Sequence, residues 1–290
     1  MSPSRNERAR NESLYQTLTL VLWISLSPFG IATLMRFFDS RLLWIGALLC
    51  GVLACAGAAQ AQPMPTRVVV RAVSNDAKLL QDPVGGAQIT IRNADTGQVL
   101  ARGTQRGNSG STERIMRQPE ARGDTLYATD GAAKYETTLV LRRPTQVVVE
   151  AEGPLAYPQA LQRAEKTLLL VPGKDIDGDG ITLTLHGFIV EVLSPETYSS
   201  DADSLDVRAR VRMLCGCPTE PGGLWDASRY TIRAQLITAD GAVVDESPLS
   251  FSGTTSEYEG TLPVPESRTS PLRIRVLATD AARVNFGMAE

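Results

Sequence analysis

The chain has 290 residues, with 29 Lys and Arg, 32 Asp and Glu and one His, so its net charge is -3. It contains no basic run, which argues against nucleic acid as a partner, because binding to a phosphate backbone requires clustered positive charge. The single histidine, His186, limits Ser-His-Asp and Cys-His catalytic schemes to one residue. No H-E-x-x-H, G-x-S-x-G or phosphate-binding glycine loop is present, so the sequence favours a protein that is not an enzyme.

The residues before the first strand predict export from the cytoplasm. Arg36 and Arg41 precede an apolar run over 42–54, and Ala59-Gln60-Ala61 has the A-x-A form of a signal-peptidase site. We therefore expect a signal peptide over 35–61 and a mature protein that is periplasmic or secreted.

Residues 1–34 allow two interpretations. Because a complete signal layout begins after them, we interpret them as an extension of the gene model, with translation starting at Met35. The alternative is a membrane segment over 14–34, since about 20 apolar residues span a bilayer. Contact with the membrane is expected only if that segment is real or if Cys55 carries a lipid.

Alternation of apolar and polar side chains predicts strands through the first half of the mature chain. Ala87, Ile89 and Ile91 alternate with polar neighbours, Ala94–Gly97 supplies a turn, and 98–102 returns as the partner strand. Further strands are expected over 67–73, 125–129, 136–141, 145–152 and 167–171, and residues 158–165 allow at most about two helical turns.

The second half repeats this pattern. Leu205, Val207, Ala209, Val211 and Met213 alternate with charged residues, which is typical of a sheet with one face in water. Other strands are expected over 181–193, with a break at Gly187, and over 230–236, 243–251, 258–262 and 272–278. Short strands separated by turns predict an all-β chain with two tandem immunoglobulin-like or prealbumin-like β-sandwiches, one over 62–174 and the other over 175–290.

The segment Val84–Gly97 carries a resemblance to a known family. Its sequence, VGGAQITIRNADTG, resembles the opening hairpin of carboxypeptidase-regulatory-like and transthyretin-like domains, and the match extends over residues 84–103. The resemblance implies a small prealbumin-type sandwich that acts as a structural or binding module. It implies no catalytic residue.

Cys215-Gly216-Cys217 is the most specific short motif of the chain that could carry chemistry. These are the only cysteines of the mature chain, and three interpretations are open: a disulfide, a metal site, or free or intermolecular thiols. Because residues 213, 215 and 217 of a strand face the same side, Met213 and the two thiolates form a candidate Cu(I) ligand set, with His186 as a fourth ligand. Met213 is otherwise a core residue, and His186 a packed or surface histidine.

Asp175, Asp177 and Asp179 reproduce the first half of a Ca²⁺-binding loop, with Gly180 after them. The twelfth position is His186 rather than Glu, and a strand follows, so the loop is not an EF-hand. A calcium site of another kind and a solvated acidic turn are the two interpretations.

Residues 215–226 form a compact loop of Cys, Pro, Gly and Trp, and we predict that recognition lies there. Its candidate contact residues are Pro218, Gly222, Gly223, Trp225 and Asp226, with Trp225 either packed over the cysteines or exposed. The leading hypothesis is an exported, non-enzymatic binding or accessory module for an envelope protein. The alternatives are Cu(I) handling or redox activity of the Cys pair, and no cofactor other than Cu(I) or Ca²⁺ is indicated.

Overall fold

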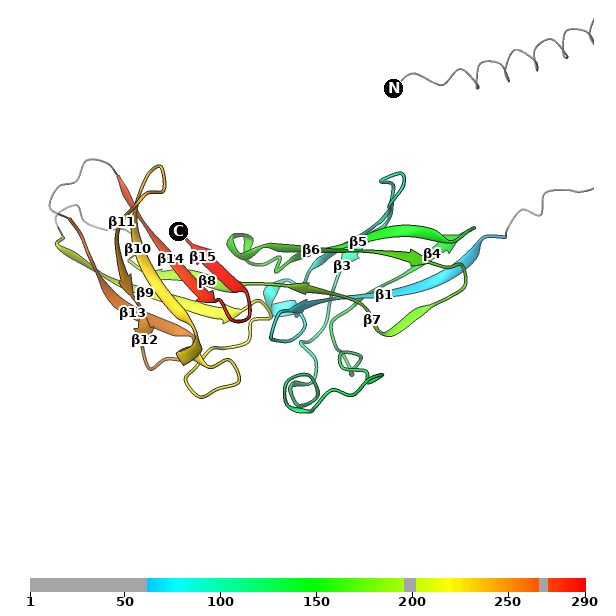
Figure 1. Ribbon diagram of the computed structural model, residues 1–290, viewed down its shortest axis with the longest axis horizontal. Helices are drawn as coiled ribbons and strands as arrows, with labels where there is room; N and C mark the ends of the chain where they lie inside the picture. Colours follow the sequence, from blue (N-terminus) through cyan, green and yellow to red (C-terminus); the bar gives the residue numbers. More distant parts are fainter. Residues whose placement is uncertain (1–61, 196–201, 266–270) are drawn as a thin grey trace, which may run out of the picture. The chain divides into compact units, whose positions relative to one another are not determined.

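The computed structural model describes residues 62–195, 202–265 and 271–290 (Figure 1). The expected signal peptide, the alternative membrane segment and Cys55 all lie outside these residues and stay predictions. In the described ranges, no helix has both the length and the apolar character needed to cross a bilayer.

The described chain is all-β, as predicted, with four sheets and only short helical turns. Its strands are β1 (Met64–Ser74), β2 (Gln88–Asn93), β3 (Val99–Thr104), β4 (Tyr135–Leu141), β5 (Thr145–Gly153), β6 (Gln162–Leu170), β7 (Ile176–Leu185), β8 (Phe188–Ser194), β9 (Ser204–Met213), β10 (Thr231–Thr238), β11 (Val243–Pro248), β12 (Ser250–Phe251), β13 (Glu257–Pro263), β14 (Leu272–Asp280) and β15 (Asn285–Ala289). The helical turns are η2 (Asp82–Val84), η3 (Glu113–Arg117), η4 (Pro158–Ala160) and η5 (Ala227–Arg229).

The first seven strands form two sheets, ordered β4-β1-β7 and β3-β2-β5-β6. All their pairs are antiparallel except β1 with β7, which is parallel. Alternate residues of β1 and β2, such as Val68, Val70, Ile89 and Ile91, are fully buried and belong to one hydrophobic cluster with β4, β5, β6 and β7. The predicted hairpin of β2 and β3 is confirmed, and Gly97 takes the positive φ of 71° that its turn requires.

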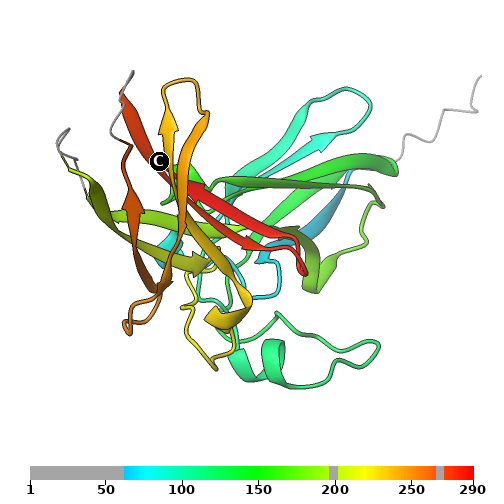
Figure 2. The same ribbon diagram turned by 60° about the vertical axis from the view of Figure 1, so that its left-hand side comes forward.

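The last eight strands form the sheets β11-β10-β14-β15 and β12-β13-β9-β8, which are seen from two directions in Figures 1 and 2. The alternation predicted for β9 is confirmed, since Leu205, Val207, Ala209, Val211 and Met213 are buried. They pack in a second hydrophobic cluster with residues of β8, β10, β13, β14 and β15.

Side chains cross between the two clusters. Ala77, from the turn after β1, lies in the second cluster, while Ile189 and Leu214 from the second half lie in the first. The turn that holds Asp76 and Ala77 is therefore a point where the two halves of the described chain are packed together.

The change from the first pair of sheets to the second falls at His186–Gly187, between β7 and β8. The sequence predicts a domain boundary at 174/175. In the structure, β7 follows that position but pairs with β1, so β7 belongs to the first pair of sheets. The break expected at Gly187 is present, with φ at 147°. The division into domains itself stays a prediction.

One local prediction is wrong. Residues 125–129 form no strand, because the amides of Leu126, Tyr127 and Ala128 donate to the Asp179 carboxylate instead of to a neighbouring strand. Over 158–165, where the sequence allows at most about two helical turns, η4 is the helical part, and the residues from Gln162 are paired with β5 as part of β6.

A long excursion joins β3 to β4, over residues 105–134, and lies on the β1 and β7 side of the first sheets (Figures 1 and 2). Gln105, fully buried, exchanges hydrogen bonds with the main chain of Ala72 and also donates to the Leu80 carbonyl. Further along, Met116 packs against the second hydrophobic cluster. The excursion is thus fixed to both halves of the described chain.

Candidate functional site

The loop after β9 begins with the cysteine pair. The sulfur atoms of Cys215 and Cys217 lie at disulfide-bonding distance, with their Cα atoms 5.4 Å apart, which agrees with the disulfide interpretation. Gly216, between them, has φ at 81°, and its amide donates to the Met213 carbonyl over 2.7 Å. The Gln81 side-chain amide donates to the Cys215 carbonyl over 2.9 Å, which fastens this turn to the first half of the chain.

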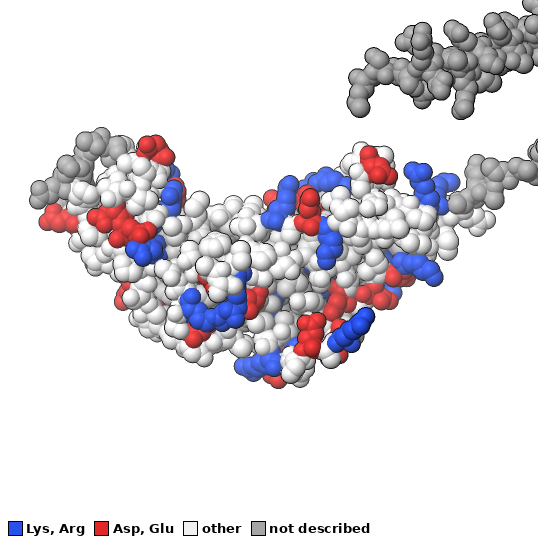
Figure 3. Space-filling view, in the orientation of Figure 1, with Lys and Arg blue, Asp and Glu red and all other residues white. Residues whose placement is uncertain are grey.

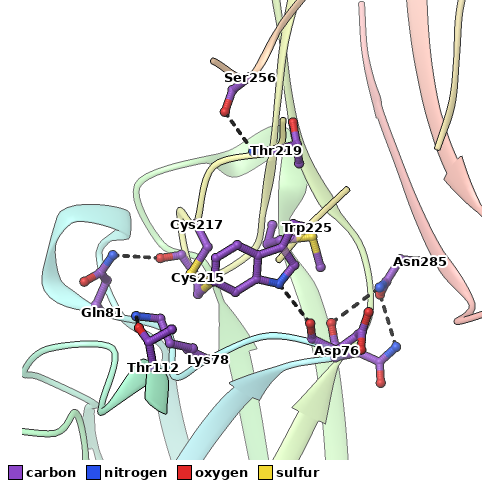
Figure 4. Close-up of a disulfide and its surroundings, with 12 residues drawn as sticks. Asp76, Lys78, Gln81, Thr112, Cys215, Cys217, Thr219, Trp225, Ser256 and Asn285 are labelled. Atoms are coloured by element: carbon purple, nitrogen blue, oxygen red, sulfur yellow. Dashed lines mark hydrogen bonds between the residues drawn. A yellow bond between two sulfur atoms is a disulfide. The ribbon is translucent and has the colours of Figure 1, made fainter. Parts of the chain in front are cut away.

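Trp225 covers the cysteine pair. Its side chain is 6% exposed and belongs to the same hydrophobic cluster as Cys215 and Cys217. Its indole Nε1 donates to the Asp76 carbonyl over 3.0 Å, and Figure 4 shows the ring beside the two sulfurs with its nitrogen directed at that carbonyl. Of the two roles considered for Trp225, the structure therefore has the packed one.

Thr219 anchors the start of the loop. It is fully buried, its hydroxyl donates to the Val211 carbonyl over 2.7 Å and accepts from the Tyr258 hydroxyl over 2.8 Å. Burial raises the pKa of Tyr258, while its hydrogen bond with Thr219 acts in the opposite direction. The main chain of Thr219 is also bonded to Ser256 in both directions.

The rest of the loop closes on itself around Asp226. This carboxylate accepts from the amides of Ser228 and Gly222, over 3.0 and 3.1 Å, and these bonds lower its pKa. Because it caps η5 and holds Gly222, Asp226 serves first to shape the loop. Gly222 itself has φ at 72°, which only glycine adopts freely.

An open pocket of about 380 Å³ lies at this loop. Pro218, Glu220, Leu224 and Trp225 line it from the loop, and Arg117 lines it from the end of η3. The lining also includes Gly222 and Gly223. Four of the five predicted contact residues, Pro218, Gly222, Gly223 and Trp225, thus border one hollow.

The four candidate copper ligands do not form one cluster. Met213 is fully buried, and the Tyr230 hydroxyl lies 3.8 Å from its sulfur. His186 is exposed on the turn between β7 and β8, where its Nδ1 lies 3.2 Å from the Val284 carbonyl oxygen. Among the residues described, no group of three or more His, Cys, Asp or Glu side chains could hold a metal ion. Copper handling stays an untested hypothesis for the reduced pair.

The three aspartates of the candidate calcium loop each have protein partners. Asp175 accepts from the Arg67 amide over 2.8 Å, and Asp177 lies 3.4 Å from the Arg67 guanidinium. Asp179 accepts from three consecutive amides, those of Leu126, Tyr127 and Ala128, over 2.7 to 2.8 Å. The segment is an irregular part of β7, where the register with β1 shifts, rather than a free loop.

Asp179→Asn should destabilise the protein by about 1–3 kcal/mol, because one carboxylate oxygen that accepts from these backbone amides becomes a donor that faces them. Asp177→Asn is the matched control, since the Asp177 side chain is 72% exposed and should have almost no effect on the melting temperature. Equal melting of the two variants would contradict the role of Asp179 as an anchor. In the same melts, added Ca²⁺ should stabilise the wild type more than Asp177→Asn only if the aspartates bind it.

Several lining residues were not singled out from the sequence. Arg117 is in a segment that reads only as a long polar loop, and Glu220 and Leu224 have no pattern of their own. For Glu220 and Leu224, the one indication in the sequence was that they lie close to Pro218 and Trp225 in the chain. Nothing local indicates that Arg117 reaches the same hollow.

Charged side chains of both signs are interspersed on the face shown in Figure 3. Many are paired, as in the network where Glu257 accepts from Arg208 and Arg210 over 2.6 and 2.8 Å. The hydrogen bond from Arg210 holds the pKa of Glu257 below its usual value.

No protein-family model matches the chain, and no curated protein matches it. Among solved structures, the apo structure of Bacteroides uniformis β-glucuronidase 3 is 10% identical, with a TM-score of 0.18, over 78% of this chain. The chain spans only 24% of that protein. A second structure, the CsuC–CsuE chaperone–tip adhesion subunit pre-assembly complex of the archaic chaperone-usher Csu pili of Acinetobacter baumannii, is 8% identical, with a TM-score of 0.16, over 74% of this chain and 99% of the matched one. Neither likeness supports a functional argument.

Proposed function

We propose that this chain is an exported, non-enzymatic binding module built from two tandem immunoglobulin-like sandwiches, which recognises another protein of the cell envelope through the loop Pro218–Asp226. The carboxypeptidase-regulatory-like resemblance of residues 84–103 agrees with a binding role. The proposal depends on one observation above the others. The inner side of this loop is hydrogen-bonded to the scaffold, whereas its outer side lines an open pocket.

The fixing is extensive. Thr219 and Trp225 are buried, and each is hydrogen-bonded to a different part of the scaffold, Trp225 to Asp76 and Thr219 to Val211 and Tyr258. A loop held in this way loses little conformational entropy on binding, which favours affinity.

The front of the loop offers mixed chemistry. Leu224 is 37% exposed, Glu220 and Arg117 supply opposite charges, and Pro218 is exposed beside them. An apolar contact surrounded by polar groups is the usual arrangement of a protein-binding surface.

Leu224→Glu should abolish capture of the partner while leaving the fold intact. The measurement is affinity capture from an envelope extract with the full chain as bait, followed by titration of the retained protein. Wild type should retain a specific protein, and Leu224→Glu should bind it at least about tenfold more weakly, because a charge enters the apolar contact.

Val243→Glu is the matched control, since Val243 is an exposed apolar residue on β11 in another part of the second half. It should retain the partner as the wild type does. A wild-type protein that is strictly monomeric in gel filtration and captures nothing, or equal capture by Leu224→Glu, would contradict the proposal.

A further inference from the structure

A second pocket, of about 510 Å³, lies on the outer face of β1, where the excursion between β3 and β4 covers the strand. Arg67, Val69 and Arg71 line it, and they alternate along β1 with Val68 and Val70, which fill the first hydrophobic cluster. Residues 128–132 of the excursion and Asp177 and Gly178 of β7 also line it. A hollow of this size suits a small molecule.

Arg71 is the unusual residue of this pocket because it is a buried cation. Its side chain is 3% exposed, and its Nη1 donates to the carbonyls of Ala133 and Ala132 over 2.7 and 3.3 Å. Nη2 has only a 3.4 Å bond to the Gly178 carbonyl, and Nε has no hydrogen-bond partner in the described chain. One edge of the guanidinium, formed by Nε and Nη2, is therefore poorly satisfied.

The other cations of the pocket each have a carboxylate partner. Arg67 lies 3.4 Å from Asp177, Lys134 lies 2.5 Å from Glu136, and Arg106 lies 3.7 Å from Asp82. No carboxylate of the described residues lies within 4.0 Å of the Arg71 guanidinium, although Asp179 and Glu136 act on it from further away. A buried guanidinium without a direct counter-ion is costly, and an anion from outside would offset that cost.

The charged side chains that line the pocket determine which class of anion it can bind. Asp130, Glu136 and Asp177 are the acidic side chains that line the pocket, while Arg106 is paired with Asp82 beside it. Arg71 is therefore the lining cation that has no carboxylate within 4.0 Å among the described residues. A dianion such as phosphate would be repelled by these acids, whereas a planar carboxylate matches the two donors of a guanidinium edge. The exposed Asp130 carboxylate would accept from a hydroxyl or ammonium group on the same ligand.

We propose that this pocket binds a small hydroxy- or amino-carboxylic acid, whose carboxylate takes the place of the Gly178 carbonyl and accepts from Nη2 and Nε of Arg71. Gly178 is exposed, has φ at 60° and lies in the irregular part of β7, where the register with β1 shifts. This site is separate from the loop Pro218–Asp226 and does not depend on the function proposed for it.

The test is saturation-transfer NMR on the full 290-residue chain, with acetate, glycolate, glycine and inorganic phosphate as separate probes. Glycolate or glycine should bind more tightly than acetate, and phosphate should bind least. Glycolate as the tighter of the two identifies a hydroxy acid, and glycine an amino acid. Arg71→Lys keeps the charge but loses the two-donor edge, so it should weaken carboxylate binding by about tenfold.

Asp130→Asn is the second variant, because an exposed side chain can be changed without loss of the fold. It should remove the advantage of glycolate and glycine over acetate while acetate itself binds at least as well. If Arg71→Lys does not fold, the proposal is tested by Asp130→Asn alone, through its binding of glycolate and glycine relative to acetate. No binding of any carboxylate to the wild type, equal binding to a folded Arg71→Lys, phosphate binding as tight as the carboxylates, or an unchanged ratio in Asp130→Asn would overturn the proposal.

Discussion

Val207→Asp should unfold the second half of the chain. Val207 is fully buried in the centre of β9 and packs in the second hydrophobic cluster. A carboxylate there would lose its hydration with no cation on that face, and such changes cost about 4 kcal/mol or more. Since domains are stable by about 5–15 kcal/mol, we expect loss of the cooperative melt or a large fall in the urea midpoint.

Arg208→Glu is the matched control on the adjacent residue. The Arg208 side chain is 49% exposed and faces the exposed Glu259 and Glu257, whose side chain is 12% exposed and keeps its partner Arg210, so the variant exchanges an attraction at the surface for a repulsion. It should lower the melting temperature only slightly. If the two variants melted alike, the register of β9 would be wrong, because a shift of one residue exchanges the two faces of a strand.

The strands that the sequence predicts well are those with one solvent-exposed face and one buried face. On β9 the alternation is local, so the orientation of the strand can be predicted without knowledge of its neighbours. β15 was missed because its large apolar residues, Phe286 and Met288, are exposed while Asn285 and Ala289 are buried, which reverses the usual pattern. Its place is decided by packing instead, since a Cβ on Gly287 would lie 2.7 Å from the Phe188 carbonyl.

Long-range contacts account for the other errors. Nothing near residues 125–129 indicates that their amides bind a carboxylate more than 50 residues away. Likewise, residues 67–73 read only as an apolar, β-branched strand, and the burial of Arg71 comes from the excursion between β3 and β4 and from β7. β7 and β1 are paired in parallel although most of the first half of the chain lies between them, so no local sequence pattern predicts their pairing.

The candidate loop could be predicted from its composition, but the roles of its residues could not. Trp225, Pro218 and the two glycines mark an unusual turn in the sequence alone. Burial then assigns Trp225 to the scaffold and leaves Leu224, Glu220 and Arg117 at the surface. An aromatic residue in a loop is therefore a guide to where a site lies rather than to what touches the partner.

Trp225→Ala should destabilise the protein by about 3–5 kcal/mol, as expected when a large buried ring leaves a cavity. The lost ring also exposes Cys215 and Cys217, which it covers, and removes the hydrogen bond to Asp76 that fastens the loop to the first half. The urea midpoint measures the first effect. The rate at which a small reductant reduces the cysteine pair measures the second, and it should rise in the variant.

Trp225→Phe separates packing from hydrogen bonding. It keeps most of the apolar contact with the cysteine pair and loses the donor to Asp76, for which a cost of about 1 kcal/mol is typical, with a smaller change in reduction rate. A midpoint for Trp225→Ala close to that of the wild type would place the indole outside the core. A midpoint for Trp225→Phe as low as that for Trp225→Ala would instead make the hydrogen bond, rather than the ring, the main link between the loop and the first half.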